Sequence, residues 1–244
     1  MKLINSKGVS KDKHVISVVE QLVQHPELFV QVSRIFTDYN TAPSDTEEVN
    51  EYVDSLFHSP KVKSPTDVIE KLITAIRSIY SLNTEHFNSI KSKILEKIIY
   101  EFGPFTEGLE RKQIFIEPTI KDGDYTVGES DNKCDFVFYE KNEKPLELIE
   151  CKSNISSIIP KKLSFENSQR SAQKKVSYLH RAYVYLEETY CKPFIYFACY
   201  NAYIKSEKRN LQEHWGYPHI SILNPDIILK MYLFRLGKDR LRNM

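Results

Sequence analysis

Apolar residues recur at helical spacing through the N-terminal part of the chain, which is typical of helices that bury one face. Pro65 fits the first turn of a helix, and the Gly103-Pro104 pair is a helix stop. We predict helices at residues 14–22, from 26 onward, and at 45–54, 64–76 and 84–102. The stretch 45–54 contains acids and no Lys or Arg, as a solvated helix face would. The pattern therefore predicts a helical N-terminal region over residues 1–85.

The pattern changes after this last helix, where short runs rich in Phe, Tyr, Ile and Val replace the helical stripes. The polar turn 140–144 is short enough to join two antiparallel strands. We predict strands at 113–117, 134–139, 145–153, 193–202 and 219–223, a turn at 121–124, and helices at 165–190 and 225–236. This order predicts an α/β fold with a central mixed β-sheet flanked by helices, in a domain spanning residues 86–244.

The composition is that of a soluble globular protein. The 244 residues include 34 Lys and Arg and 33 Asp and Glu, so the net charge is +1, and the mean hydropathy is −0.43. We expect no signal peptide and no membrane segment, because no apolar run approaches about 18 residues. The four cysteines form no C-x-x-C pair, and we expect small buried side chains in a reducing cytoplasm. Because the net charge is near zero, binding to nucleic acid must rest on local patches.

Several common chemistries lack their motifs. The glycine pairs 103/108 and 123/128 have P-loop spacing, but no lysine follows them, and no G-x-G-x-x-G occurs. We therefore expect no nucleotide cofactor. The seven histidines include no H-E-x-x-H, and no G-x-S-x-G occurs, so zinc and serine-hydrolase sites are not expected either.

The most informative stretch carries three charged residues on adjacent predicted strands. Side chains alternate along a strand, so Glu150 and Lys152 project from the same face and Cys151 from the other. Asp135 begins the neighbouring strand. Two carboxylates and an ammonium at adjacent strand ends can hold a hard divalent cation and steady the charge that develops on a phosphate.

The E-x-K spacing alone has a plainer interpretation as a solvated charge pair. It occurs a second time at Glu110 and Lys112, where no strand surrounds it, and there we accept the plain interpretation. Glu150 differs because it interrupts an apolar strand, and burying an unpaired charge is costly. An edge strand with one wet face is the alternative at Glu150.

The order of a Glu-bearing helix, a strand, an Asp-led strand, an E-x-K strand, a helix and a strand resembles the PD-(D/E)-x-K nuclease superfamily, which has the restriction endonuclease-like fold. The resemblance covers about residues 90–202, and Cys134 stands in place of the motif's proline. It implies Mg²⁺, with Mn²⁺ as a substitute, held by Asp135 and Glu150. It also implies that Lys152 is the catalytic lysine.

The superfamily also carries a glutamate on the helix before the first strand. The local pattern of the resemblance selects Glu96. Helical periodicity instead places Glu96 nearly opposite the apolar stripe and Glu101 at its border, so Glu101 is the alternative. For each of the two glutamates, the alternative interpretation is a surface carboxylate with no role in the site.

A local basic surface follows the E-x-K strand. Between residues 159 and 183 the chain carries six basic side chains and one acid, which suits a phosphate backbone. We expect nucleic-acid contacts from Lys161, Lys162, Arg170, Gln173 and Lys174. Gln173 with Tyr178 loosely resembles a glutamine that reaches the active site in some branches of the superfamily, and Gln169 would share its helix face. A solvated helix face is the plainer interpretation of the two glutamines. A second basic cluster comprises Arg235, Lys238, Arg240 and Arg242.

The residues and the resemblance together predict a Mg²⁺-dependent endonuclease that hydrolyses DNA phosphodiester bonds, in a restriction (type II-like) or other defence role. A homodimer fits this function, because cutting both strands needs two sites. Three alternatives stay open. They are a repair or recombination nuclease or an RNase of the same fold, a nucleic-acid-binding module without catalysis, and an interaction protein with a chance match.

Overall fold

The computed structural model describes residues 1–5, 7–42, 46–129, 132–140 and 145–242, without the side chains of 238–242. The N-terminal part is helical, as predicted, after a first short strand. Its elements are β1 (Lys2–Ile4), α1 (Lys13–Gln24), η1 (Pro26–Leu28), α2 (Phe29–Asp38), α3 (Glu47–Phe57) and α4 (Thr66–Tyr80). Asp45, in the predicted acidic helix, lies outside the described residues.

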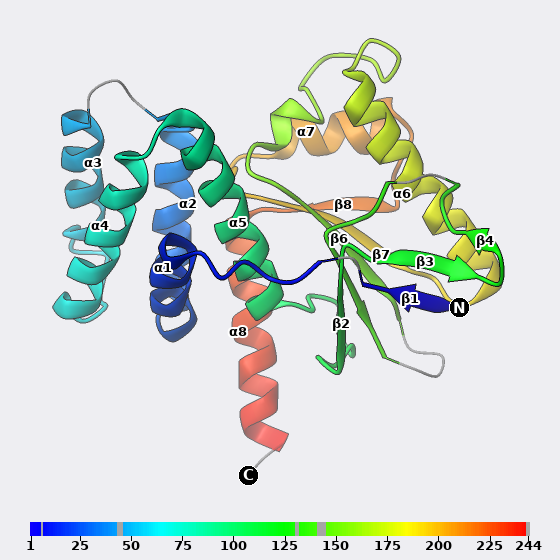
Figure 1. Cartoon of the computed structure of the whole chain (residues 1–244), viewed down its shortest axis with the longest axis horizontal. Helices are drawn as coiled ribbons and strands as arrows, with labels where there is room; N and C mark the ends of the chain where they lie inside the picture. Colours follow the sequence, from blue (N-terminus) through cyan, green and yellow to red (C-terminus); the bar gives the residue numbers. More distant parts are fainter. Residues whose placement is uncertain (6, 43–45, 130–131, 141–144, 243–244) are drawn as a thin grey trace.

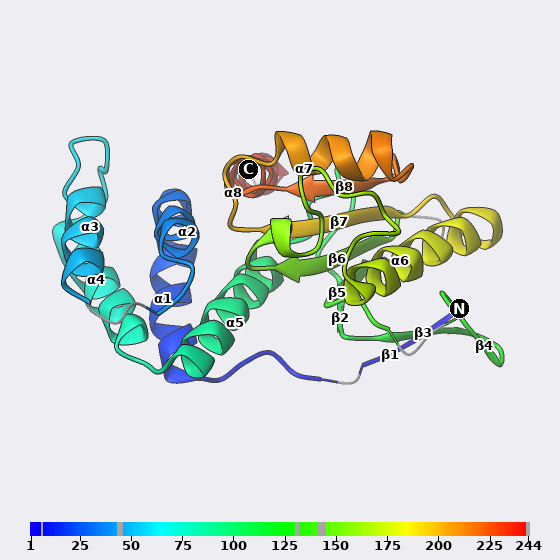
Figure 2. The ribbon, with the colours of Figure 1, turned by 90° about the horizontal axis from the view of Figure 1, so that it is seen from above.

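Helix α5 (Thr84–Phe102) connects these helices to the sheet, with α1–α4 on one side of it and the strands on the other (Figures 1 and 2). Its bounds agree with the prediction because both ends carry local signals. Asn83 accepts a hydrogen bond from the backbone N–H of His86 and caps the first turn. Gly103 ends the helix in extended conformation, where a side chain would collide with the ring of Phe138.

The central sheet is mixed and has five strands, which confirms the general α/β class. Its order is β2–β5–β6–β7–β8. The first three strands pair antiparallel, and β6, β7 and β8 pair parallel. The strands are β2 (Gln113–Ile116), β5 (Phe136–Tyr139), β6 (Glu147–Lys152), β7 (Phe194–Cys199) and β8 (Ile220–Leu223). The β5–β6 hairpin is antiparallel as predicted, and most of its turn, 141–144, lies outside the described residues.

Alternating side chains of the sheet enter two separate cores. On one face Phe136, Ile149 and Ala198 pack with the N-terminal helices, α5 and α8 (Pro225–Arg242). On the other face Val137 and Leu148 pack against α6 (Arg170–Thr189). The first core is continuous across residue 85, so the N-terminal helices pack directly on the sheet domain; the boundary at 85/86 stays a prediction.

Some elements differ from the sequence prediction. The helix expected at 165–190 begins only at Arg170, because the preceding segment forms turns whose carbonyl groups accept hydrogen bonds from the side chain of Gln173. A small second sheet, β1–β3–β4, pairs β1 with β3 (Thr119–Asp122), and β3 with β4 (Tyr125–Thr126) across the predicted turn. Three short helical elements were also not predicted: η2 (Ile155–Ser157), α7 (Lys205–Arg209) and η3 (Asn210–His214).

Two compositional expectations can be compared with the structure. Cys134, Cys151 and Cys199 are buried free thiols, as expected, whereas Cys191 is half-buried. Among the helices in the described part of the chain, none combines the length and apolar character needed to cross a membrane.

Candidate active site

Asp135 lies where three strands meet. The β5–β6 register pairs Phe136 with Ile149, so Asp135 stands next to Glu150 across the hairpin. The carbonyl oxygen of Asp135 accepts a hydrogen bond from the N–H of Glu117 at 2.9 Å, beyond the end of β2. Its carboxylate Oδ2 accepts one from the N–H of Cys151 at 2.6 Å. The backbone of the sheet therefore holds the main chain of Asp135 from the side of β2 and its carboxylate from the side of β6.

Glu150 is a buried carboxylate bound by two ammonium groups. Its side chain is 1% exposed. Its Oε1 lies 2.7 Å from Nζ of Lys152, and its Oε2 lies 2.9 Å from Nζ of Lys175. The pairing with Lys152 is the contact expected from two residues on the same face of a strand. The structure thus brings together Asp135, Glu150 and Lys152, the three residues selected from the sequence.

Lys175 was missed as a site residue, because it was counted only within the basic surface of its helix. It reaches across from α6, and Nζ also donates to the carbonyl oxygen of Lys133 at 2.5 Å. A signal was present in the sequence: Lys175 lies on the apolar stripe of α6, next to the buried Val176 and Leu179. An acidic partner lowers the cost of placing a lysine on a buried stripe, and for Lys175 the partner is Glu150.

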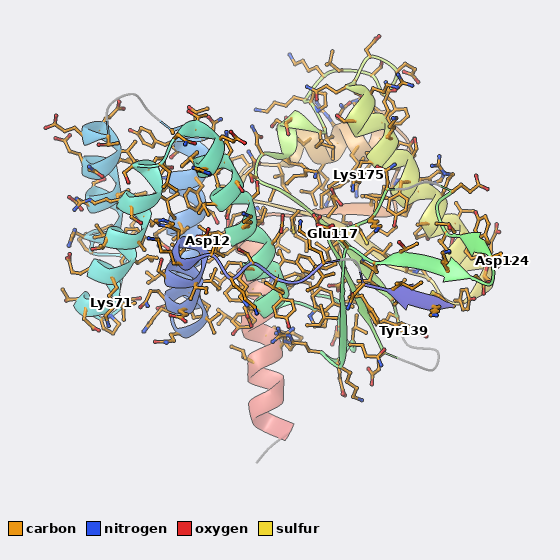
Figure 3. All side chains as sticks on the ribbon, viewed as in Figure 1. Asp12, Lys71, Glu117, Asp124, Tyr139 and Lys175 are labelled. Carbon is orange, nitrogen blue, oxygen red and sulfur yellow. The ribbon has the colours of Figure 1, made fainter. Side chains whose placement is uncertain are left out.

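A second ion pair adjoins the site from the N-terminal segment. Nζ of Lys7 lies 2.7 Å from Oε1 of Glu117. The hydrogen bond with Glu117 raises the pKa of Lys7, and the charges of Glu96 and Asp135 add to the rise. Figure 3 labels Glu117 and Lys175, which approach this part of the sheet from the end of β2 and from α6. No sequence motif pointed to Lys7 or Glu117.

The carboxylates of the site repel one another. Removal from water raises the pKa of Asp135 to about 8, and the neighbouring charge of Glu150 adds to the rise. Burial also raises the pKa of Glu96, against the opposing effects of Lys7 and Lys152. For Lys152 burial alone would lower the pKa, but Glu150 and Asp135 outweigh it and raise it. Such mutual perturbation at one end of a sheet is common at functional sites.

The structure distinguishes the two candidate glutamates of α5. Glu96 is half-buried, and its carboxylate experiences the charges of Lys152 and Glu150. Glu101 instead forms ion pairs with Lys97 at 2.8 Å and Arg111 at 3.4 Å. Glu96 is therefore the helix carboxylate that the fold brings to the site, in agreement with the local pattern and against the apolar periodicity.

The predicted basic surface is only partly as expected. Lys161, Lys162, Arg170 and Lys174 are exposed, as a phosphate-binding surface requires. Gln173 is different: its Nε2 donates to the carbonyl oxygens of Phe165, Glu166 and Ser168, so it holds the loop before α6.

The two glutamines lie one helical turn apart, as expected. Gln169 is the N-cap of α6, and its carbonyl oxygen accepts a hydrogen bond from the backbone N–H of Gln173 at 3.0 Å. Tyr178 is buried in the core between α6 and the sheet. Of the C-terminal cluster, Arg235 donates to the carbonyl oxygen of Pro104, and the side chains of Lys238, Arg240 and Arg242 lie outside the described residues.

A hollow on this basic surface adjoins α6. Arg170, Lys174 and Arg181 line it together with the ring of Phe165. Nε of Arg181 donates to the carbonyl oxygen of Gly128 at 2.9 Å, which fixes one wall. Cationic side chains beside an aromatic ring can contact both the phosphates and the bases of a nucleic acid.

The donor set of the site is compatible with a hard divalent cation. Within the described residues, no three His, Cys, Asp or Glu side chains are grouped as a metal cluster. Mg²⁺ requires fewer protein ligands, because it is usually bound by one or two carboxylates together with water and substrate phosphate. Asp135 and Glu150 supply two neighbouring carboxylates whose repulsion a cation would relieve, as the raised pKa of Asp135 indicates.

No family model matches the chain, and no curated protein matches it. The resemblance to the PD-(D/E)-x-K superfamily therefore stays a prediction.

Proposed function

We propose that the chain is a metal-dependent endonuclease that hydrolyses DNA phosphodiester bonds, built on a restriction endonuclease-like core. One observation carries the proposal: Glu150, 1% exposed, binds the ammonium groups of Lys152 and Lys175 while it stands beside Asp135. Charged groups buried together rarely improve stability over apolar residues of similar size. Their presence at the meeting point of three strands is better explained by chemistry on a charged substrate.

The carboxylates of Asp135 and Glu150 would hold Mg²⁺, or Mn²⁺ in its place, with Glu96 nearby. The cation would supply a Lewis acid for the phosphate and lower the pKa of water. No nucleotide cofactor is required. Glu150 is buried, and Oδ2 of Asp135 accepts a hydrogen bond from the backbone. Both carboxylates are therefore held in place before substrate binds.

Lys152 is the residue best suited to act on the reacting groups. It is half-buried, its ammonium lies 2.7 Å from Glu150, and its raised pKa keeps it protonated at neutral pH. A fixed ammonium can orient the attacking water and stabilise negative charge on the phosphate. Lys175 acts through Glu150 as a positioning residue, since it binds the other oxygen of that carboxylate.

Glu96 can serve as the proton acceptor of the site. Its carboxylate is half-buried and its pKa is raised, which brings it closer to the range that suits a general base. The exposed residues Lys161, Lys162, Arg170 and Lys174 would bind the DNA backbone. Gln173 would contribute by holding the loop that presents this surface.

The arrangement of elements around the site supports the restriction endonuclease-like core. Helix α5 precedes β2, the β5–β6 hairpin carries the three selected residues, and α6 leads to β7, parallel to β6. A homodimer belongs to the proposal, because cutting both strands of a duplex requires two such sites. The restriction or other defence role and the cytoplasmic location rest on the sequence reasoning alone.

The test compares two E-x-K glutamates of the same chain. Plasmid and single-stranded DNA are incubated with the wild type, Glu150→Gln and Glu110→Gln, in Mg²⁺ and in EDTA. We expect metal-dependent cleavage that falls by at least about 100-fold in Glu150→Gln. Glu110→Gln should retain the cleavage activity, because Glu110 pairs with Lys112 at the surface and lies outside any strand.

The cleavage products distinguish two kinds of endonuclease. Discrete bands indicate a sequence-specific enzyme, and smears indicate a nonspecific one. Melting curves show whether each variant is folded. Metal-dependent cleavage that survives in folded Glu150→Gln would refute the site, and binding without any cleavage by the wild type would refute the enzyme.

A further inference from the structure

A second pocket adjoins the candidate active site on the side of α5. Lys152 and Ser153, at the end of β6, form one wall, and Lys91 and Ser92 of α5 form another. Every lining residue is a lysine, serine, threonine or asparagine, so no carboxylate and no aromatic ring is among the described residues that line it. Ammonium groups and neutral hydrogen-bonding groups without acids are the chemistry that binds an oxyanion. We call this the Lys91 pocket.

Lys91 is the unusual residue of the pocket. It is 4% exposed, its Nζ donates to the carbonyl oxygen of Asn40 at 2.6 Å, and its ammonium lies 5.1 Å from the ring centre of Phe87. In the described part of the chain no carboxylate lies within 4.0 Å of this ammonium. Lys152, by contrast, is paired with Glu150.

A buried ammonium without an acidic partner is costly, and fixed surroundings make it a binding group. An ammonium has three N–H donors, and the carbonyl oxygen of Asn40 accepts one. Burial lowers the pKa of Lys91 to about 8, which leaves it mostly protonated at neutral pH. Because no carboxylate among the described residues balances the charge of Lys91, a ligand can supply the negative charge.

The walls of the pocket are held by hydrogen bonds between elements. The hydroxyls of Ser92 and Ser153 lie 2.9 Å apart and join α5 to the end of β6. The hydroxyl of Tyr200 donates to the backbone carbonyl of Lys91 at 2.9 Å. Asn154, the next lining residue, accepts from the N–H of Ser156 at 3.1 Å. The pocket is thus preformed, which reduces the cost of binding.

We propose that the Lys91 pocket binds a phosphodiester group of the DNA strand next to the one that is cleaved. This inference rests on the proposed nuclease function. Lys152 belongs both to the catalytic cluster and to the pocket, so a strand whose reacting phosphate lies at Glu150 and Lys152 continues into it. The absence of an aromatic ring from the described lining favours backbone over base recognition, which carries no sequence information.

The test measures DNA binding without cleavage. Fluorescence anisotropy in EDTA, with a labelled oligonucleotide as single strand and as duplex, gives the affinity of the wild type, Lys91→Met and Lys93→Met between about 50 and 200 mM salt. Lys93 is the matched control, because it is a lysine of the same helix that does not line the pocket.

We expect Lys91→Met to bind about tenfold more weakly, through the loss of one charge-assisted hydrogen bond. The slope of log affinity against log salt should fall by about 0.7 to 0.9, which corresponds to one phosphate contact. Lys93→Met should match the wild type in both quantities.

A second variant avoids the buried lysine in case its replacement impairs folding. Asn88 is exposed and lines the pocket, so Asn88→Asp adds a negative charge there without changing the core. It should weaken binding as Lys91→Met does. If the wild type binds DNA and the folded variants bind as tightly as Lys93→Met, the pocket is refuted while the nuclease proposal stands. If the wild type binds no DNA, the nuclease proposal fails and this inference falls with it.

Discussion

The carboxyl of Asp135 gives the most direct test of the site, because its charge state affects stability without any substrate. Its pKa is raised from 3.8 to about 8 by partial burial and by Glu150. A rise of this size corresponds to roughly 5 to 6 kcal/mol between the protonated and charged forms. Asp135 retains some contact with solvent, so we expect about half of that, roughly 3 kcal/mol, to be measurable.

The sign follows from proton binding. Between pH 4 and 8 the folded state keeps the proton that the unfolded chain has released, so the free energy of unfolding of the wild type falls as pH rises through this range. Asp135→Asn removes the titration, and its amide oxygen can still accept from the N–H of Cys151. In EDTA the variant should match the wild type near pH 4 and exceed it by about 3 kcal/mol above pH 8.

Urea unfolding of both proteins across this pH range supplies the measurement. Asp124→Asn, in the exposed turn between β3 and β4, is the control and should follow the wild type. Mg²⁺ should then stabilise the wild type at pH 8 by about 2.7 kcal/mol at one hundred times its Kd, and Asp135→Asn much less. Parallel curves for the wild type and Asp135→Asn in EDTA would refute the reasoning, because they would mean that burial and the charge of Glu150 do not raise the pKa of Asp135.

Three further substitutions test other contacts. Lys175→Met removes one of the two partners of Glu150. It should lower the free energy of unfolding in urea by about 1 to 3 kcal/mol and slow cleavage at least about tenfold. Lys174→Met, on the exposed face, should leave stability unchanged. Glu147→Gln should cost about 2 to 3 kcal/mol without altering the metal dependence of cleavage, since this buried carboxylate accepts from two backbone N–H groups after α5. Gly128→Ala should lower stability by about 2 to 4 kcal/mol, because φ is 86° there and a Cβ atom would collide with the ring of Tyr178; wild-type stability in that variant would contradict the close approach.

Most helices and strands were predictable from local sequence patterns. The bounds of α5 were predictable because its cap, Asn83, and the residue that ends it, Gly103, directly flank the helix in the sequence. The pairing of Glu150 with Lys152 was predictable for the same reason, since alternation along a strand is a property of the backbone. These features depend on residues that are close in sequence.

Features that depend on distant contacts were not predictable. The strand β1 is three residues long and becomes a strand only because β3, more than a hundred residues later, pairs with it. The ion pair between Lys7 and Glu117 likewise joins residues that are more than a hundred positions apart in the sequence. The start of α6 was predicted too early because the turns at 165–169 depend on hydrogen bonds from Gln173, which no periodicity reveals.

The local charge balance explains why a net charge of +1 says little about partners. Around the site stand the acids Asp135, Glu150, Glu96 and Glu117 and the bases Lys152, Lys175 and Lys7, a set with one excess negative charge when all are ionised. While Asp135 is protonated, below its pKa of about 8, the cluster carries no net charge and does not attract a phosphate. A bound divalent cation would make the net charge positive, so that the same cluster attracts one. The ammonium of Lys91, which has no carboxylate partner among the described residues, needs no such change, and neither do the exposed cations before and along α6. DNA can therefore be held from both sides of a centre that admits a phosphate only once the cation is present.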